Sequence, residues 1–217
     1  LHGEFATTLT CFPDGEPADM AHTEQLFTPP TPQWTIKTRE EFGQFRQTLM
    51  RHLKHSIIPT AFEDLDAQLR TVEQEEHPEY FVRRKELTLG SGALTHRGTF
   101  FGKPKGARKT VIRLADDKID EAALTAFYRN TFLEDGVNLF CLEITGIGEN
   151  PWSTANRYLY DRFAQLVGHT KCSLRINDIL AAVATISREQ EVNPEAIYLW
   201  GKGNLAVPVI YSAVVNS

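Results

Sequence analysis

The feature that most constrains the fold is an alternation of apolar, strand-length runs with amphipathic, helix-length segments in the second half of the chain. The segments near residues 121–133 and 173–190 place apolar residues at helical spacing. Strands that alternate with helices of this length favour a parallel sheet with helices on both faces, so the sequence predicts an α/β fold. The apolar runs are Thr110–Ala115, Val137–Leu142 and Ala196–Trp200.

Composition changes along the chain predict three regions. Residues 1–35 are rich in Pro and Thr and predict an extended connector. We expect residues 36–79 to form a helical N-terminal extension and residues 80–217 to form the α/β domain. That domain begins with short β-like runs between Phe81 and Phe101, which predict antiparallel strands at the edge of the sheet.

Two helices are expected in the N-terminal extension. Thr38 and Glu41 have the spacing of a capping box, in which each side chain bonds the backbone of the other. They precede an amphipathic stretch that predicts a helix over Arg39–Lys54. A second apolar stripe predicts a helix over Ala61–Gln74.

Composition excludes several classes of function. The chain has 217 residues, of which 41% are hydrophobic and 24% charged, the balance of a globular protein with a sizeable core. Its net charge of −5 argues against a nucleic-acid partner, and no apolar run reaches the length of a membrane span. Cys11, Cys141 and Cys172 have no CxxC spacing, which argues against a zinc ribbon. We expect neither a metal nor a cofactor.

The turn after the last predicted strand admits two interpretations. Gly201-Lys-Gly-Asn-Leu-Ala206 has the GxGxxA form of a dinucleotide fingerprint, but that motif opens the first βαβ unit and needs an acidic residue about 20 positions later. Only 14 residues follow Gly203, and none of them is Asp, Glu or His. The turn also fits a nucleophile elbow, GxSxG, whose central position is Gly203 here. The elbow is the favoured interpretation.

Three segments together resemble the bacterial acetyl-xylan-esterase-like α/β-hydrolases, including proteins that carry two such domains in tandem. The resemblance implies an α/β-hydrolase-like sheet, incomplete on one side, with the chain as the second domain of such a tandem protein. It also favours a secreted or periplasmic location. The family has an Arg where this chain has Thr145, so a guanidinium that would brace the site is missing. The three segments are Asp135–Glu149, Leu166–Ala182 and Ile197–Ala213.

Acyl transfer requires a nucleophile, a base and oxyanion donors. The central residue of the family's elbow is Ser, and Gly203 cannot attack a carbonyl. The backbone N–H of Asn204 could act as an oxyanion donor, together with one from the loop at 115–118. The catalytic residues of this chain are therefore unassigned.

Four further residues are candidates for substrate binding. Asp116 and Asp117 follow a predicted strand at its carboxyl end, where open α/β sheets bind ligands, although turn and helix-cap chemistry also explains them. Glu149 could form a carboxylate site with Glu143. His169 could line a pocket or form a structural hydrogen bond.

Other polar residues have simpler interpretations. His96 stands alone among polar neighbours in the sequence, so we expect it to lie on the surface. Arg175 and Asp178 lie three residues apart on one predicted helix and are spaced to pair with each other.

The sequence predicts a hydrolase-like domain that resembles carbohydrate esterases, has no nucleophile of its own, and serves a structural or binding role. The alternative is an active carboxylic ester hydrolase acting on acylated polysaccharide, with triad residues from another segment or chain. The strand Ile197–Trp200 would leave an apolar edge of the sheet open. We expect a second polypeptide, the remainder of the same protein, or a homo-oligomer to cover it. Carbohydrate is a further expected ligand.

Overall fold

The computed structural model describes residues 35–57, 66–90, 94–148, 151–152, 157–166 and 168–215. The chain divides into two compact units, Leu1–Phe45 and Arg46–Ser217, and the boundary lies inside helix α3 (Arg39–Ile57). The predicted connector lies outside the described residues except for its last position. Within the described part, no helix is both long and apolar enough to cross a membrane.

Helix α3 begins where the capping box predicts. The Glu41 backbone N–H donates to Thr38 Oγ1 at 3.1 Å, and the Thr38 N–H donates to Glu41 Oε2 at 3.1 Å. These two bonds satisfy donors that the start of a helix otherwise leaves unpaired. The predicted helix over Arg39–Lys54 is confirmed.

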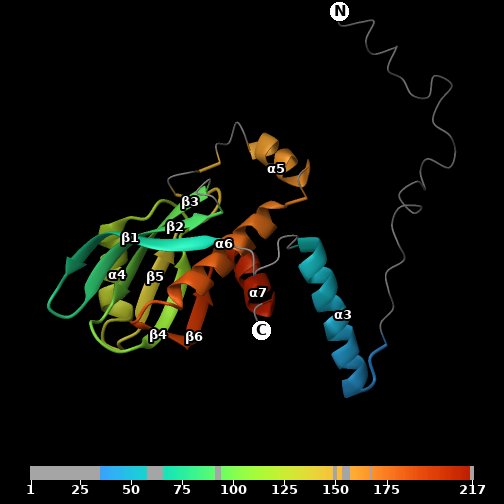
Figure 1. Cartoon of the computed structure of the whole chain (residues 1–217), viewed down its shortest axis with the longest axis horizontal. Helices are drawn as coiled ribbons and strands as arrows, with labels where there is room; N and C mark the ends of the chain where they lie inside the picture. The colour runs from blue at the N-terminus through green and yellow to red at the C-terminus, as the bar shows by residue number, and fades with distance from the viewer. Residues whose placement is uncertain are drawn as a thin grey trace, which may run out of the picture. The chain divides into compact units, whose positions relative to one another are not determined.

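The second unit contains a six-stranded mixed sheet with the order β1-β2-β3-β5-β4-β6 (Figure 1). Strands β1, β2, β3 and β5 are antiparallel neighbours, whereas β4 runs parallel to both β5 and β6. The predicted parallel core with antiparallel edge strands is therefore confirmed. The strands are β1 (Ala67–Glu76), β2 (Phe81–Leu89), β3 (Leu94–Gly102), β4 (Arg108–Leu114), β5 (Asn138–Leu142) and β6 (Val192–Trp200).

Helices cover both faces of the sheet, because each parallel crossover requires one. On one face, Ile179 and Ile186 pack against Phe100, Ile112 and other buried side chains of the strands. On the other, Leu124 and Tyr128 pack against a second buried cluster, which includes strand residues of β3 and β5. The first pair belongs to α6 and the second to α4. The helices of this unit are α4 (Glu121–Thr131), α5 (Arg157–Leu166), α6 (Lys171–Ile186) and α7 (Ala206–Val215).

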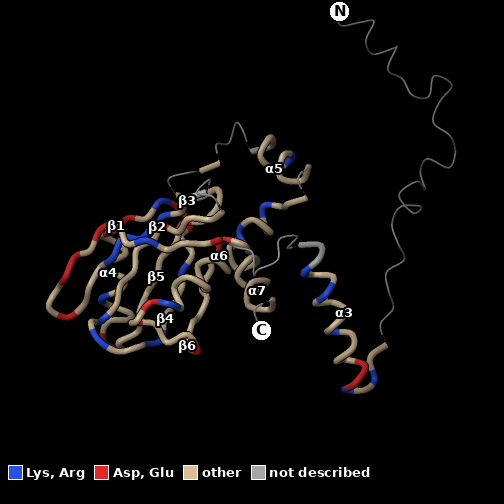
Figure 2. The backbone as a smooth tube through the Cα atoms, in the orientation of Figure 1, with Lys and Arg blue, Asp and Glu red and all other residues tan. Residues whose placement is uncertain are grey.

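The predicted helix over Ala61–Gln74 is wrong, because the described part of this stretch forms strand β1. Ala67 and Leu69 alternate toward the core, and the strand pairs antiparallel with β2 along its length. Its acidic end (red in Figure 2) lies beside basic residues of β2, where Arg84 contacts Glu73 at 2.7 Å. Cross-strand pairing thus overrides a helical spacing of apolar residues. The predicted helical extension over residues 36–79 ends before this strand.

Candidate functional site

A sharp turn links the end of β6 to α7. After Trp200 the chain passes through Gly201 and Lys202 into a 3-10 turn at Gly203–Leu205, and α7 continues from Ala206. The Leu205 N–H donates to the Lys202 carbonyl at 3.1 Å, which closes the turn. Since β6 is parallel to β4, this corner lies at the carboxyl edge of the parallel strands. The geometry is the strand–turn–helix corner that the sequence predicts.

The two glycines of this corner serve different purposes. A Cβ at Gly201 would lie 2.5 Å from the Leu205 carbonyl oxygen, so only glycine allows the strand and helix to approach this closely. Gly203 has a φ of +58°, the left-handed region, and a Cβ there would meet nothing within 4 Å. The apex of the turn therefore has room for a side chain but has none.

A cavity of about 470 Å³ opens at the carboxyl ends of β4 and β6, beside this turn. The loop after β4 forms one wall and Trp200 with Lys202 another. Open α/β sheets bind ligands at this edge. The residues that line it include Arg113, Asp116, Asp117, Lys118, Phe127 and Trp200.

Aromatic rings and a guanidinium form the floor of this cavity. The guanidinium carbon of Arg113 lies 4.9 Å from the ring centre of Phe127 and 5.7 Å from that of Trp200. The two rings are themselves 5.6 Å apart. Arg113 Nη2 lies 3.7 Å from Asp116 Oδ1, which places a negative charge at the rim of the cavity. These contacts fix Arg113, which holds the aromatic surface and the acidic rim together.

Asp116 and Asp117, which the sequence offers as candidates for substrate binding, both line this cavity. Asp117 Oδ1 also accepts the Lys118 N–H at 2.8 Å, so it takes part in the turn. The helix cap is supplied instead by Asp120, whose carboxylate accepts the N–H groups of Ala122 and Ala123. Asp116 instead faces Arg113 across the rim of the cavity, so neither aspartate caps the helix.

Asn204 lies in the first turn after the apex, as an oxyanion donor would. No side chain caps this turn at Lys202 in the described part of the chain. In the opposite loop, the N–H of Ala115 already donates to Leu142, and that of Lys118 to Asp117. A second donor from this loop could come only from the two aspartates.

Of the two remaining predicted site residues, the structure describes only His169. His169 lies in the turn before α6, where its N–H donates to the Ala164 carbonyl at 2.8 Å. It is not among the residues that line the cavity beside Gly203. Glu149 lies outside the described residues. Among the described residues, no three His, Cys, Asp or Glu side chains gather as a metal site would require.

A buried histidine–carboxylate pair was not predicted from the sequence. His96 is 4% exposed, and its Nε2 lies 3.0 Å from Asp178 Oδ1, off the line of a good hydrogen bond. Asp178 Oδ2 accepts the Thr145 N–H at 2.8 Å, and Arg175 Nε donates to the Thr145 carbonyl. The prediction that His96 lies on the surface is wrong, because β3 places it against α6.

This pair cannot serve the apex at Gly203. Strand β3, which carries His96, is separated from β6 by β5 and β4. At ~4.8 Å for each strand, the two strands are about 14 Å apart across the sheet. A base must lie within hydrogen-bond distance of its nucleophile, so His96 and Asp178 brace the sheet against α6 instead.

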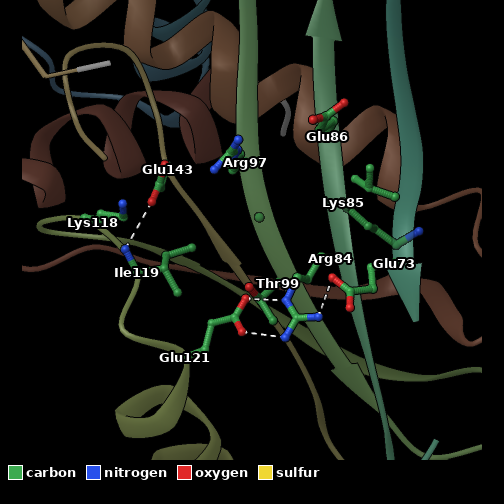
Figure 3. Close-up of a pocket in the computed structure, with 12 residues that line it drawn as sticks. Glu73, Arg84, Lys85, Glu86, Arg97, Thr99, Lys118, Ile119, Glu121 and Glu143 are labelled. Atoms are coloured by element: carbon green, nitrogen blue, oxygen red, sulfur yellow. Dashed lines mark hydrogen bonds and ion pairs between the residues drawn. The ribbon is translucent and has the colours of Figure 1, made fainter. Parts of the chain in front are cut away.

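A larger cavity, of about 580 Å³, lies where β1–β3 meet the start of α4, and on its wall Arg84 pairs with Glu121 and Glu73 (Figure 3). Arg84 makes two hydrogen bonds of 2.6 Å to the Glu121 carboxylate. These bonds lower the pKa of Glu121 despite its partial burial. Glu143 Oε1, also on this cavity, accepts the Ile119 N–H at 3.0 Å. The cavity thus combines a partly exposed ion pair with buried polar side chains such as Glu143 and Thr99.

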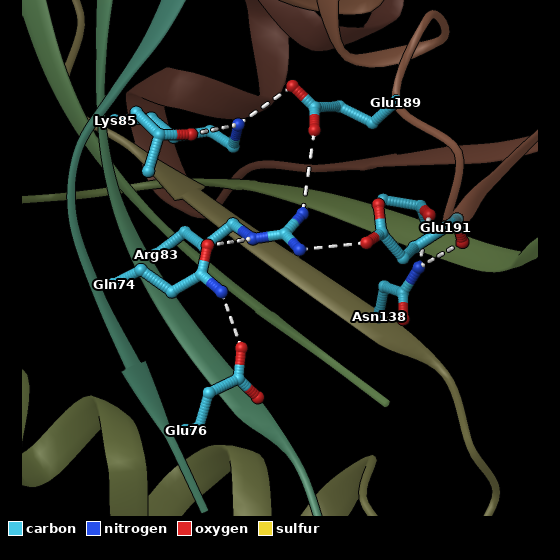
Figure 4. A network of polar contacts seen from close by, with 9 residues as sticks. Gln74, Glu76, Arg83, Lys85, Asn138, Glu189 and Glu191 are labelled. Atoms are coloured by element: carbon cyan, nitrogen blue, oxygen red, sulfur yellow. Dashed lines mark hydrogen bonds and ion pairs between the residues drawn. The ribbon is translucent and has the colours of Figure 1, made fainter. Parts of the chain in front are cut away.

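A polar network on the other face ties β2 to the connection between α6 and β6 (Figure 4). Lys85 is almost fully buried, and its Nζ lies 2.7 Å from Glu189 and 3.0 Å from Thr71 Oγ1. Arg83 lies 2.8 Å from Glu191. Since every member has a partner, the network is structural.

Comparison with known proteins agrees with this architecture. No protein-family model and no curated protein matches the sequence. Among solved structures, a candidate acetyl xylan esterase from Bacteroides fragilis is similar at 11% identity with a TM-score of 0.70, over 93% of this chain and 59% of that one. A CE15 esterase from a marine bacterial metagenome matches at 8% identity with a TM-score of 0.57, over 81% and 59%.

A third structure is acetyl xylan esterase 1 from a Thermoanaerobacterium species, at 10% identity with a TM-score of 0.54, over 78% of this chain and 54% of that one. The chain thus spans less than two thirds of each of these proteins. The sheet, the crossovers and the elbow define an α/β-hydrolase fold. Within that fold class, the similar structures are acetyl xylan esterases and related esterases, which confirms the predicted resemblance at the level of the fold.

Proposed function

We propose that this chain is an esterase-like domain that keeps the elbow and its facing loop but binds its ligand without hydrolysing it. The observation that carries the proposal is the apex at Gly203, which has space for a nucleophilic side chain and has only a hydrogen atom. Without a nucleophile, an oxyanion donor such as the Asn204 N–H has no tetrahedral intermediate to stabilise.

The ligand class follows from the cavity and the fold. Trp200 is 41% exposed and offers a flat apolar ring, while Asp116 and Asp117 offer carboxylate acceptors beside it. A sugar has apolar C–H faces and a rim of hydroxyl donors, which suit this combination. Two of the similar structures are acetyl xylan esterases. We therefore infer an acylated polysaccharide as the ligand.

An experiment separates binding from catalysis. The purified chain is assayed for hydrolysis of 4-nitrophenyl acetate and acetylated xylan, and its binding to acetylated xylan is measured by affinity electrophoresis. We expect retardation without turnover, and we expect Trp200→Ala to reduce retardation. Leu159→Ala on helix α5, which changes an exposed side chain away from the cavity, is the matched control.

The alternative is an active ester hydrolase whose nucleophile and base come from another segment or chain. The observation on its side is that the similar esterases are longer, since this chain spans 59% and 54% of two of them. Turnover that a serine-directed inhibitor abolishes, with the label on this chain, would contradict the binding role. Label on a separate polypeptide would favour the alternative.

A further inference from the structure

The larger cavity, on the antiparallel half of the sheet, is a second place where a ligand fits. Its volume of about 580 Å³ lies within the range of small-molecule sites, about 300–1,000 Å³. Residues of β1, β2 and β3 form one side of it, and the loop before α4 forms the other (Figure 3). We call it the Arg84 cavity. Its charged lining includes Glu73, Arg84, Glu86, Arg97, Lys118 and Glu121.

This lining favours an uncharged ligand. Every nitrogen of the Arg84 guanidinium already has a carboxylate partner. Its Nε and Nη2 donate to Glu121, and its Nη1 lies 2.7 Å from Glu73. A bound anion would lie beside carboxylates and a bound cation beside Lys and Arg side chains, so an ion of either sign would meet like charge. An uncharged polar molecule avoids both penalties.

A buried hydroxyl on the wall of the Arg84 cavity has no protein partner among the described residues. Thr99 lies on β3 and is 3% exposed, and no described hydrogen bond uses its Oγ1. It sits opposite Arg84 in the pairing of β2 with β3, beside the Arg84–Glu121 pair (Figure 3). A buried polar group without a hydrogen bond costs free energy. A ligand that bonds this hydroxyl would remove that cost.

Glu121 supplies a fixed acceptor next to this hydroxyl. Its side chain is 42% exposed, and two hydrogen bonds of 2.6 Å from Arg84 hold it in place. The same bonds lower the pKa of Glu121, so it stays ionised at neutral pH. An ionised carboxylate has about four lone-pair sites, which leaves capacity for ligand hydroxyls. Val72 and Ile119 add apolar surface. Hydroxyl groups and C–H faces together are the chemistry of a sugar unit.

The Arg84 cavity and the cavity beside Gly203 share a wall. Lys118 and Ile119 line both of them. The Ile119 N–H donates to Glu143 Oε1 at 3.0 Å, and Glu143 is 4% exposed, so a buried carboxylate holds the shared wall in place. A ligand longer than one sugar unit can therefore pass across residues 118–119 from one cavity to the other.

We propose that the Arg84 cavity binds an uncharged sugar unit, and that one polysaccharide chain crosses Lys118 and Ile119 to occupy the cavity beside Gly203 as well. Thr99 Oγ1 and the Glu121 carboxylate bond the hydroxyls of this sugar unit. The crossing rests on the proposed function, because it takes the cavity beside Gly203 as a sugar site. The sugar unit in the Arg84 cavity does not depend on it.

Calorimetric titration of the whole chain with xylobiose and xylohexaose tests the proposal. We expect xylohexaose to bind about tenfold more tightly, because the longer chain reaches both cavities. Thr99→Val removes the hydroxyl with little change of shape and should weaken xylohexaose binding about fivefold, whereas Thr99→Ser keeps the hydroxyl and should bind like the parent chain. Thr95→Val, on the same face of β3 but outside the cavity, is the matched control. No described hydrogen bond is lost in Thr99→Val, so its unfolding midpoint should not change.

Three results would overturn the proposal. They are unchanged xylohexaose affinity in Thr99→Val, equal affinity for xylobiose and xylohexaose, and tighter binding of anionic hexagalacturonate than of xylohexaose. Trp200→Ala reports on the other cavity separately. Weaker binding in Trp200→Ala alone would refute the sugar unit in the Arg84 cavity and leave the proposed function standing. Weaker binding in Thr99→Val alone would keep that sugar unit and contradict both the crossing and the proposed function.

Discussion

Gly201→Ala is the substitution that probes the elbow most directly. The new Cβ would lie 2.5 Å from the Leu205 carbonyl oxygen and 2.8 Å from Val209 Cγ2. The Leu205 oxygen belongs to the backbone at the start of the helix, so relief requires α7 to move away from β6. Overpacking of this kind costs about 1–3 kcal/mol. We expect the free energy of unfolding to fall by that amount.

Gly203→Ala is the matched control at the same turn. Its Cβ meets nothing within 4 Å, so its cost comes only from the left-handed backbone, about 1–2 kcal/mol. Urea titration followed by tryptophan fluorescence measures both variants, since Trp200 adjoins the turn. We expect Gly201→Ala to be the more destabilising variant. If Gly201→Ala unfolds at the same urea concentration as the parent chain, the close approach of strand and helix is not real.

Three other predictions concern buried and paired groups. Lys85→Met should lower the free energy of unfolding by about 1–3 kcal/mol, measured in urea, because Glu189 loses a hydrogen bond of 2.7 Å. Arg84 lowers the pKa of Glu121, so this pair stabilises the fold above the ordinary glutamate pKa of about 4, and that stability is lost as pH falls through the lowered pKa. Glu121→Gln should therefore flatten the decline of the urea midpoint as pH falls below about 4. Burial raises the pKa of Cys141 to about 12, so mass spectrometry should find it unmodified by iodoacetamide at about pH 8 until the chain is denatured.

The sequence predicts the parallel half of the molecule well for a physical reason. Buried parallel strands are continuous apolar runs, and the helices between them have one apolar face, so both patterns are local. The corner at Gly201 is predictable because the atom that requires glycine there, the Leu205 carbonyl oxygen, belongs to the same short segment of the chain. The location of Asp116 and Asp117 follows from the same logic, since strand ends at one edge of a parallel sheet share a cavity, while their role in binding stays a prediction.

The features that the sequence does not predict depend on distant partners. β1 contains apolar residues at both helical and strand spacing, and its pairing with β2 decides between the two. His96 has polar neighbours in the chain, yet Asp178 meets it from a helix about 80 residues later. No local pattern contains that contact. The charged cavity at Arg84 and Glu121 likewise requires three strands and a helix to converge.

The order of the strands has a consequence for how the chain folds during synthesis. β1, β2 and β3 can form a meander from neighbouring residues, but β4 touches neither β3 nor any earlier strand of the sheet. β5 is the bridge between them, so β4 has no place in the growing sheet until Asn138–Leu142 has left the ribosome. β4 then waits again for β6 on its other side. The apolar residues of β4 therefore stay exposed in the nascent chain until both of its neighbours have been made, and exposed apolar surface of this kind is prone to aggregation.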